Sequence, residues 1–231
     1  MNKKLTASLL AIALLPLSAF AQDIYVAPRL GYGTLKGTFK AAAPDYEEKI
    51  GSQSKGSAVL GLAWGYDFKV KLSLPIRAEL EYAYLGSGSK THKDIDEGDL
   101  QLTKMTLGGS TLFANTYFDF HNKSAFTPYV SVGLGTSFLQ AKGKVSYPDD
   151  DGDAGGSFKK KTSSKFAWNL GVGAAWKVTD NIALDLGYRY ANLGKARTGY
   201  MKNFEGDTYN AWAKTNSVTA HQFLLGGRFS F

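Results

Sequence analysis

The stretch Asn181–Gly194 reads N-I-A-L-D-L-G-Y-R-Y-A-N-L-G, and its alternate positions differ in character. One face carries large apolar and aromatic side chains, Ile182, Leu184, Leu186, Tyr188 and Tyr190. The other carries small and charged ones, Ala183, Asp185, Gly187, Arg189 and Ala191. A period of two predicts a strand. Tyrosines at the end of an apolar face suit a membrane–water interface, and small or charged residues suit the interior of a narrow barrel.

The first 21 residues are expected to form a separate unit. The chain opens with two lysines, runs apolar from Leu5 to Phe20 and then presents Ala19-Phe20-Ala21. This pattern predicts a secretory signal peptide, residues 1–21, that is cleaved after Ala21. A membrane anchor is disfavoured by the length of the run and by Pro16 inside it. Residues 22–231 are then the mature domain.

The composition of the mature chain narrows its class. Cleavage leaves 25 basic and 20 acidic residues, a surplus that suits anionic surfaces but does not indicate nucleic acid. The chain has no cysteine, so a disulfide scaffold is excluded. No later segment is apolar enough to span a membrane as a helix. The remaining classes are a periplasmic β-protein and an outer-membrane barrel.

Eight segments share the alternation of the opening stretch, each with an apolar side that carries aromatics near its ends. They are Asp23–Gly37, Gly56–Phe68, Pro75–Gly86, Leu102–Phe120, Phe126–Leu139, Phe166–Lys177, Asn181–Gly194 and Thr219–Phe231. The repetition predicts an all-β protein, an eight-stranded antiparallel up-and-down transmembrane β-barrel. Ten strands remain an alternative to eight.

The connections between these segments alternate in length. Long polar connections are Thr38–Lys55, Ser87–Gln101, Ser146–Lys165 and Lys195–Ser217; short ones are Lys69–Leu74, His121–Ala125 and Thr179–Asn181. Outer-membrane barrels have short periplasmic turns and long external loops, so four long external loops are expected. Closing the sheet also removes edges that lipid would not tolerate.

Several stretches resemble the opacity-protein and related small outer-membrane barrel family of Gram-negative surface antigens. They are Gly65-Tyr66-Asp67-Phe68, Arg77-Ala78-Glu79-Leu80-Glu81-Tyr82, Ala114-Asn115-Thr116-Tyr117-Phe118-Asp119-Phe120, Thr127-Pro128-Tyr129-Val130, Gly187-Tyr188-Arg189-Tyr190 and the terminal Phe231. The resemblance covers most predicted strands and none of the loops. It implies a barrel displayed on the cell surface with loops that contact hosts or surroundings, and no shared catalytic residues. It also implies that Phe229 and Phe231 form a signal for the barrel-assembly machinery.

Three histidines are candidates for a catalytic role: His92 in an expected loop, His121 in an expected periplasmic turn and His221 on the last predicted strand. Only His221 has hydroxyls within strand distance, on Ser217 and Thr219, and no acid has matching spacing on that strand. The sequence therefore predicts no enzyme, no catalytic residue and no cofactor.

Nine charged residues of mixed sign are expected to face the lumen: Arg29, Asp67, Arg77, Glu79, Glu81, Asp119, Asp185, Arg189 and Arg228. They could line a selective pore, or they could pair and plug the lumen. Side chains just fill an eight-stranded barrel, whereas wide channels need about sixteen strands, so the plug is favoured.

Two external segments are candidates for contact. The third long connection has Asp149-Asp150-Asp151-Gly152-Asp153, whose carboxylates could hold Ca²⁺ or belong to a solvated loop, since the later Glu of an EF-hand is missing. Lys159, Lys160 and Lys161, with Lys142, Lys144 and Lys165 nearby, could meet lipopolysaccharide phosphates. The last connection collects aromatic and apolar residues, which are typical of contact surfaces but equally of a loop that packs on itself: Tyr200, Met201, Phe204, Tyr209 and Trp212.

The sequence therefore predicts a monomeric surface barrel whose external loops mediate adhesion, surface interaction or envelope integrity, with a host or extracellular ligand as partner. The alternative is a small porin-like channel. A soluble ligand-binding barrel ranks third, because it would need an apolar interior.

Overall fold

The computed structural model describes residues 23–44, 46–96, 99–148, 155–203 and 205–231. The predicted signal peptide, the acidic run Asp149–Asp153 and Phe204 lie outside these ranges. Within them, no helix is long and apolar enough to cross a membrane.

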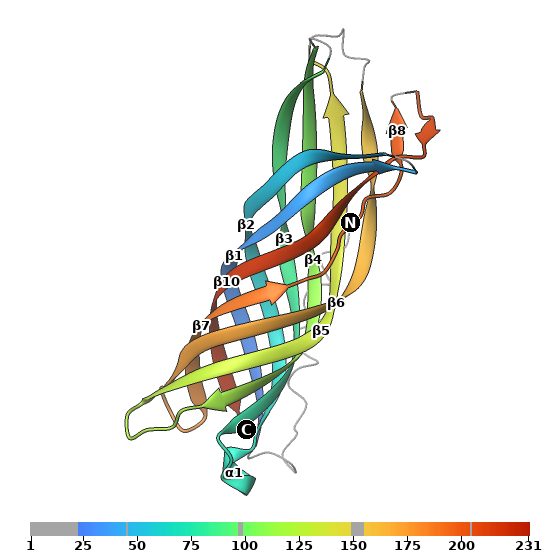
Figure 1. Ribbon diagram of the computed structural model, residues 1–231. Coiled ribbons are helices and arrows are strands. Elements are labelled where there is room, and N and C mark those ends of the chain that lie inside the picture. Colours follow the sequence, from blue (N-terminus) through green and yellow to red (C-terminus); the bar gives the residue numbers. More distant parts are fainter. Residues whose placement is uncertain (1–22, 45, 97–98, 149–154, 204) are drawn as a thin grey trace, which may run out of the picture.

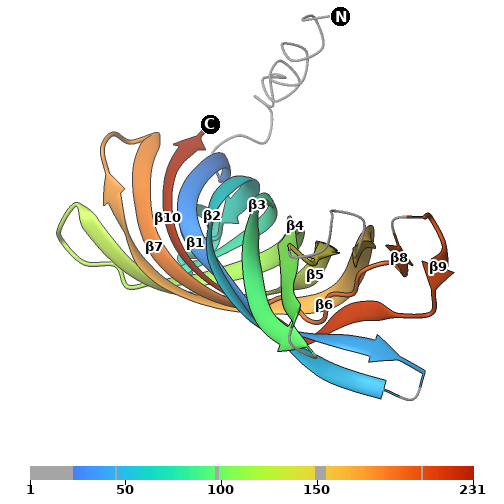
Figure 2. The ribbon, with the colours of Figure 1, turned by 90° about the horizontal axis from the view of Figure 1, so that it is seen from above.

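Eight antiparallel strands close into a barrel (Figures 1 and 2). They are β1 (Ile24–Ala43), β2 (Tyr46–Asp67), β3 (Ile76–Asp96), β4 (Asp99–Asp119), β5 (Phe126–Ser146), β6 (Gly155–Lys177), β7 (Ile182–Asn192) and β10 (Trp212–Ser230). The ring is completed by pairing of β5 with β6 and of β1 with β10. The short β8 (Met201–Asn203) and β9 (Thr208–Tyr209) form a hairpin attached to the outer part of β6. The barrel therefore has eight strands, as predicted, and not ten.

Both ends of the described barrel lie at the same side as the short connections. The Phe231 amide donates to the Ile24 carbonyl at 3.3 Å. The helix α1 (Lys69–Leu72) fills the β2–β3 turn and ends at Ser73, whose φ is 54°. This arrangement places the short turns, the first residues of β1 and the C-terminal end of β10 together at the lower end in Figure 1.

The strands are longer than the sequence predicted. β1 and β2 pair as far as Ala43 and Tyr46, so the connection expected as a loop at Thr38–Lys55 is almost entirely strand. β3 and β4 likewise pair up to Asp96 and Asp99. Spanning the bilayer takes about 9–11 residues, and only β7, with 11 residues, has that length. The alternation does not predict the outer halves because their outward faces are polar where a lipid-facing strand would be apolar, while backbone pairing with a neighbour still forms the strand.

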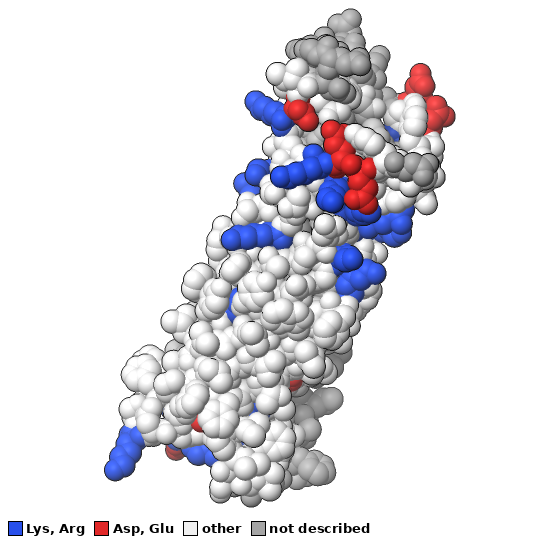
Figure 3. Space-filling view, in the orientation of Figure 1, with Lys and Arg blue, Asp and Glu red and all other residues white. Residues whose placement is uncertain are grey.

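The lower half of the barrel has an exposed apolar belt. Leu30, Leu60, Val132, Leu170 and Leu186 all point outward, and Leu186 is 64% exposed. Lysines, arginines and acids gather on the upper half of the surface and are sparse on the belt (Figure 3). The face assignment of the opening stretch is confirmed, because Leu186 is exposed while Asp185 and Arg189 are buried.

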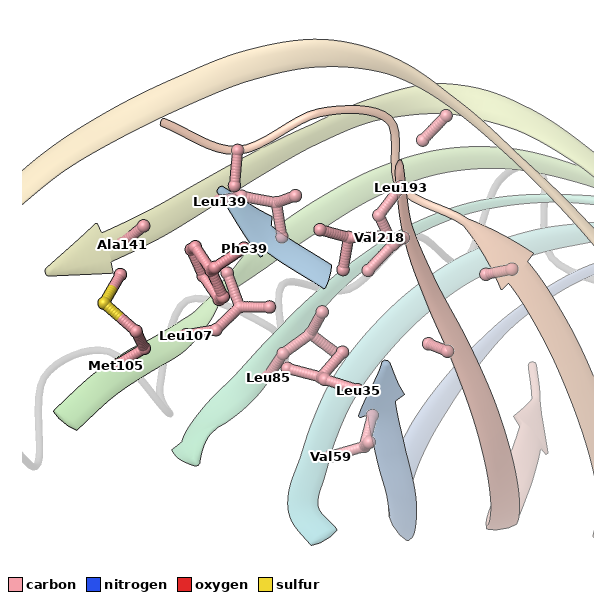
Figure 4. Close-up of a cluster of buried hydrophobic side chains, with 14 of the residues drawn as sticks. Leu35, Phe39, Val59, Leu85, Met105, Leu107, Leu139, Ala141, Leu193 and Val218 are labelled. Atoms are coloured by element: carbon pink, nitrogen blue, oxygen red, sulfur yellow. The ribbon is translucent and has the colours of Figure 1, made fainter. Parts of the chain in front are cut away.

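The interior changes character along the barrel axis. The lower lumen is polar, as expected, but the upper lumen holds a cluster of fully buried apolar side chains that the sequence analysis did not anticipate (Figure 4). Its members include Leu35, Phe39, Leu85, Met105, Leu107, Leu139, Leu193 and Val218. The inward face of the outer strands is thus apolar, and it forms a packed core above the membrane belt.

Two of the strand pairings that close the barrel end above the belt. Pairing of β2 with β3 stops at Val59 and Leu85, beyond which Gln53 Nε2 donates to the Gly88 carbonyl at 2.7 Å. Pairing of β6 with β7 stops at Trp168 and Asn192. Residues 193–200 then run between β10 and β6 and bond to both. In Figure 1, β1 and β2 bend toward β8 while β3 and β4 continue upward.

Candidate functional site

The lower lumen contains a network of buried ion pairs. Arg29 pairs with Glu79 at 2.6 Å and also with Glu81. Arg189 pairs with Glu81 at 2.5 Å. These side chains come from β1, β3 and β7, so the network joins strands that are distant around the ring.

The network extends toward the periplasmic end. Arg77 pairs with Asp119 at 2.6 Å, and its guanidinium lies 4.6 Å from the Tyr117 ring centroid. Arg228 pairs with Asp185 at 2.9 Å. Four arginines thus face four carboxylates, and their formal charges cancel. Such balance is needed where charges are removed from water.

Asp67, which the sequence placed in the lumen set, lies directly opposite Arg77 and lines a cavity at the periplasmic mouth with Asp119 and Arg228, but among the described residues it forms no ion pair with the network. Its carboxylate accepts a hydrogen bond from the Lys69 amide at 2.9 Å, at the start of α1. The reason is its position at the last residue of β2, where the chain already turns.

Little space remains in the lumen beside Arg29 and Arg189, in the middle of the network. A cavity of about 20 Å³ borders Arg29, Tyr117, Tyr129 and Arg189. A single water needs about 10–15 Å³ measured in this way. The apolar cluster fills the lumen above. The arrangement can hold water, but it leaves no wide aqueous path among the residues that the structure describes.

The external end brings together the two contact candidates of the sequence. The Gly199 amide donates to the Lys159 carbonyl at 2.7 Å, and the Lys159 amide donates to the Tyr200 carbonyl at 3.3 Å. The exposed run Lys159–Lys161 of β6 therefore lies beside the last connection. Tyr209 of β9 pairs with Met201 of β8 and is 51% exposed.

Arg197 is a member of this surface that the sequence analysis missed. Its guanidinium carbon lies 4.1 Å from the Trp212 ring centroid and 5.5 Å from that of Tyr200. The two rings are 6.0 Å apart and nearly perpendicular. The available signal was that Arg197 is the only arginine in the aromatic-rich connection Lys195–Ser217.

The charges on this surface are not all neutralised. Lys214 pairs with Glu47, and the hydrogen bond from Lys214 lowers the pKa of the Glu47 carboxyl. In the described part of the chain, by contrast, Arg197 has no carboxylate within 4.0 Å and its buried Nε has no hydrogen-bond partner. We call Lys159, Lys160, Lys161, Arg197, Tyr200 and Trp212 the external cationic patch.

The histidines occupy three unrelated places. The Nδ1 of His221 lies 2.7 Å from the Tyr188 hydroxyl, on the outer face of the barrel beside Phe223. His121 lies in the exposed β4–β5 turn, and His92 lies on the outer part of β3. Among the described residues, no group of three His, Cys, Asp or Glu side chains could hold a metal ion.

Phe229 and Phe231 lie at the periplasmic edge of the apolar belt. They are 42% and 46% exposed. Their predicted role in the assembly signal stays a prediction.

Comparison with known proteins agrees with this architecture. Residues 7–231 match the model of the outer membrane protein beta-barrel domain family. The outer membrane protein PagN of Salmonella typhimurium (strain LT2) is 32% identical over 184 residues, which cover 78% of this chain and 75% of PagN. A Rickettsia bellii (strain RML369-C) protein provisionally named an adhesin is 27% identical over 118 residues, 51% of each protein.

A solved structure supports the fold. The outer membrane protein OprG from Pseudomonas aeruginosa matches with a TM-score of 0.51 at 12% identity, covering 91% of this chain and 98% of OprG. At that identity the likeness concerns the fold alone. The resemblance to small outer-membrane barrels and the predicted location are confirmed: this chain belongs to the outer membrane protein beta-barrel domain family and is an outer-membrane protein.

Proposed function

We propose that this protein is a non-enzymatic surface adhesin that binds anionic groups on host or extracellular surfaces through the external cationic patch. Surface display allows two roles, adhesion and envelope integrity, and we propose adhesion. We also propose that it acts as a monomer, since the ring of eight strands closes within one chain.

The observation that carries the proposal is Arg197 stacked on Trp212 beside a run of exposed lysines. Guanidinium groups bind phosphate, sulfate or carboxylate through two parallel hydrogen bonds. Stacking on an aromatic ring fixes the plane of the guanidinium. Less side-chain conformational entropy is therefore lost when a ligand binds. Lys159, Lys160 and Lys161 add positive charge that attracts such a ligand.

Two further observations support adhesion over transport. The Rickettsia relative carries a provisional adhesin name. In this chain the lumen is occupied by ion pairs below and by apolar side chains above. A conducting pore would require both layers to open.

The test uses the protein expressed on a non-adherent laboratory bacterium. Adhesion to cultured epithelial cells should fall about tenfold or more for Arg197→Gln, since a hydrogen bond to a charged group contributes about 1.5–3 kcal/mol. The triple change of Lys159, Lys160 and Lys161 to Gln should have a similar effect. Lys177→Gln, at the periplasmic end, is the matched control and should adhere like the parent.

Soluble polymers that compete for the patch test whether the ligand is anionic. Dextran sulfate should block adhesion, and neutral dextran should not. If the Arg197 and lysine variants adhere normally, the patch is not the binding surface. If removal of the protein from its own bacterium sensitises cells to detergent while adhesion is unchanged, lipopolysaccharide contact and envelope integrity replace adhesion.

A further inference from the structure

Strands β10 and β1 extend the positive charge of the external cationic patch. Arg197 forms an isolated antiparallel bridge with Lys214 of β10. Lys214 in turn lies directly opposite Lys40 of β1. Like charges directly opposite one another destabilise a sheet. An anion held beside this row of three basic residues would offset their repulsion.

Glu47 of β2 supplies such an anion from within the chain. Its carboxylate pairs with Lys214 and, at 3.5 Å, with Lys40. The strand order is β2, β1, β10, so the Glu47 side chain crosses β1 to reach Lys214. The crossing point is Ala42, which lies opposite both Glu47 and Trp212 and has only a methyl side chain.

The carboxylate of Glu47 therefore lies where a second anionic group of a ligand would bind. Trp212, across Ala42 from Glu47, is also the ring on which Arg197 stacks. Neighbouring strands lie about 4.7–4.9 Å apart, so the row from Arg197 to Lys40 spans about 10 Å. Among the described residues, Glu47 pairs with the lysines of this row, whereas Arg197 pairs with no carboxylate.

The ion pairs of Glu47 are open to solvent. The side chains of Lys40 and Lys214 are 34% exposed, and that of Glu47 is 45% exposed. Acidic and basic side chains adjoin one another on this external surface in Figure 3. Exposed ion pairs contribute little free energy. An anion from solution can therefore replace the Glu47 carboxylate with little loss.

We propose that Lys40 and Lys214 form a second anion-binding subsite, which Glu47 occupies as an internal competitor until a ligand bound at Arg197 displaces it. The inference rests on the proposed function, because it requires anion binding at the external cationic patch. It adds a requirement for the ligand, which must carry at least two anionic groups within about 10 Å of each other.

The probe is fluorescein-labelled dextran sulfate, whose binding to the protein in phosphatidylcholine nanodiscs is followed by fluorescence anisotropy. This lipid has no net charge, so it does not compete for the lysines. Glu47→Gln should bind the probe about two- to fivefold more tightly than the parent, which is the range of one exposed ion pair.

Glu48→Gln is the matched control. It removes the same charge from the next residue of β2, whose side chain faces the other side of the strand. Glu48 accepts a hydrogen bond from the Tyr46 hydroxyl at 2.6 Å and forms no ion pair with the described lysines. This variant should bind the probe like the parent.

A second background tests whether the gain comes from the subsite. Lys214→Gln removes one of the two lysines that hold the Glu47 carboxylate. Adding Glu47→Gln to this background should therefore give a smaller gain than in the parent. Arg197→Gln, measured in parallel, tests the proposed function by itself.

The outcomes separate the subsite from the proposed function. If Arg197→Gln weakens binding while Glu47→Gln does not tighten it, the proposed function stands and the subsite is wrong. Equal gains from Glu47→Gln and Glu48→Gln, or a gain undiminished in Lys214→Gln, would also overturn the subsite, because they show a general effect of charge. If Glu47→Gln tightens binding but Arg197→Gln has no effect, the role of Arg197 fails and the subsite stands. Absence of binding in both the parent and Glu47→Gln would overturn both.

Discussion

Replacing Glu81 by glutamine should destabilise the barrel strongly, because this carboxylate serves two buried arginines. Its Oε1 and Oε2 accept hydrogen bonds from Arg189 at 2.5 and 2.8 Å, and Oε2 also accepts from Arg29. Glu81 is 1% exposed, so water cannot replace the lost charge. Breaking a buried pair by removing one partner costs about 3–5 kcal/mol. Arg29 keeps Glu79, which leaves Arg189 as the uncompensated charge.

A second change should restore part of this loss. In the double variant Glu81→Gln with Arg189→Met, three arginines face three carboxylates and the lumen is balanced again. The double variant should therefore unfold at higher denaturant than Glu81→Gln alone, with a coupling free energy within the range of about 0.5–3 kcal/mol seen for contacting residues.

The assay is equilibrium unfolding by guanidinium in lipid vesicles, followed by tryptophan fluorescence. Trp64 and Trp176 report on folding because both lie on the exposed apolar belt. Asp180→Asn is the control, since the Lys177–Asp180 pair lies in water at the periplasmic turn and should leave the unfolding midpoint unchanged. The reasoning would be refuted if Glu81→Gln lowered the free energy of unfolding no more than Asp180→Asn does. It would also be refuted if the changes in unfolding free energy of Glu81→Gln and Arg189→Met simply added in the double variant.

Three further predictions follow from the fold. Leu186→Arg, which faces mid-bilayer lipid, should cost about 2–4 kcal/mol, whereas Ala183→Ser on the lumen face of the same strand should be nearly silent; equal losses in vesicle unfolding would contradict the face assignment. In planar bilayers the purified protein should give no large, stable current steps, and reproducible steps would favour a pore. The folded-state pKa of His92 is lowered from 6.5 by burial, so its imidazole resonances should titrate with a midpoint below 6.5. The parent should also lose stability relative to His92→Phe as the pH falls through that range. A midpoint at or above 6.5 would contradict the burial of His92.

The sequence by itself determined the class and the lipid-facing half of the barrel. The alternation at Asn181–Gly194 is readable because lipid and lumen demand opposite side chains at successive positions, and Leu186 and Arg189 satisfy those demands without reference to any other strand. Repetition over eight segments then predicted eight strands, and the closed ring decided between eight and ten. The lumen charges could be named for the same reason, but alternation does not tell which of them pair: Asp67 accepts a hydrogen bond from the Lys69 amide instead of joining an ion pair of the network.

Only the tertiary structure decided the external half. There both faces of a strand contain polar residues, so the segment Thr38–Lys55 read as a loop although its backbone pairs throughout. The apolar upper core depends on which outer strands converge, and the stacking of Arg197 on Trp212 depends on residues 193–200 crossing between β6 and β10. The cavity of about 240 Å³ beside Ala42, Ile50 and Val145 needs the β-bulge at Ile50 and the parting of β2 from β3. Such contacts join residues far apart in the chain, and no local pattern records them.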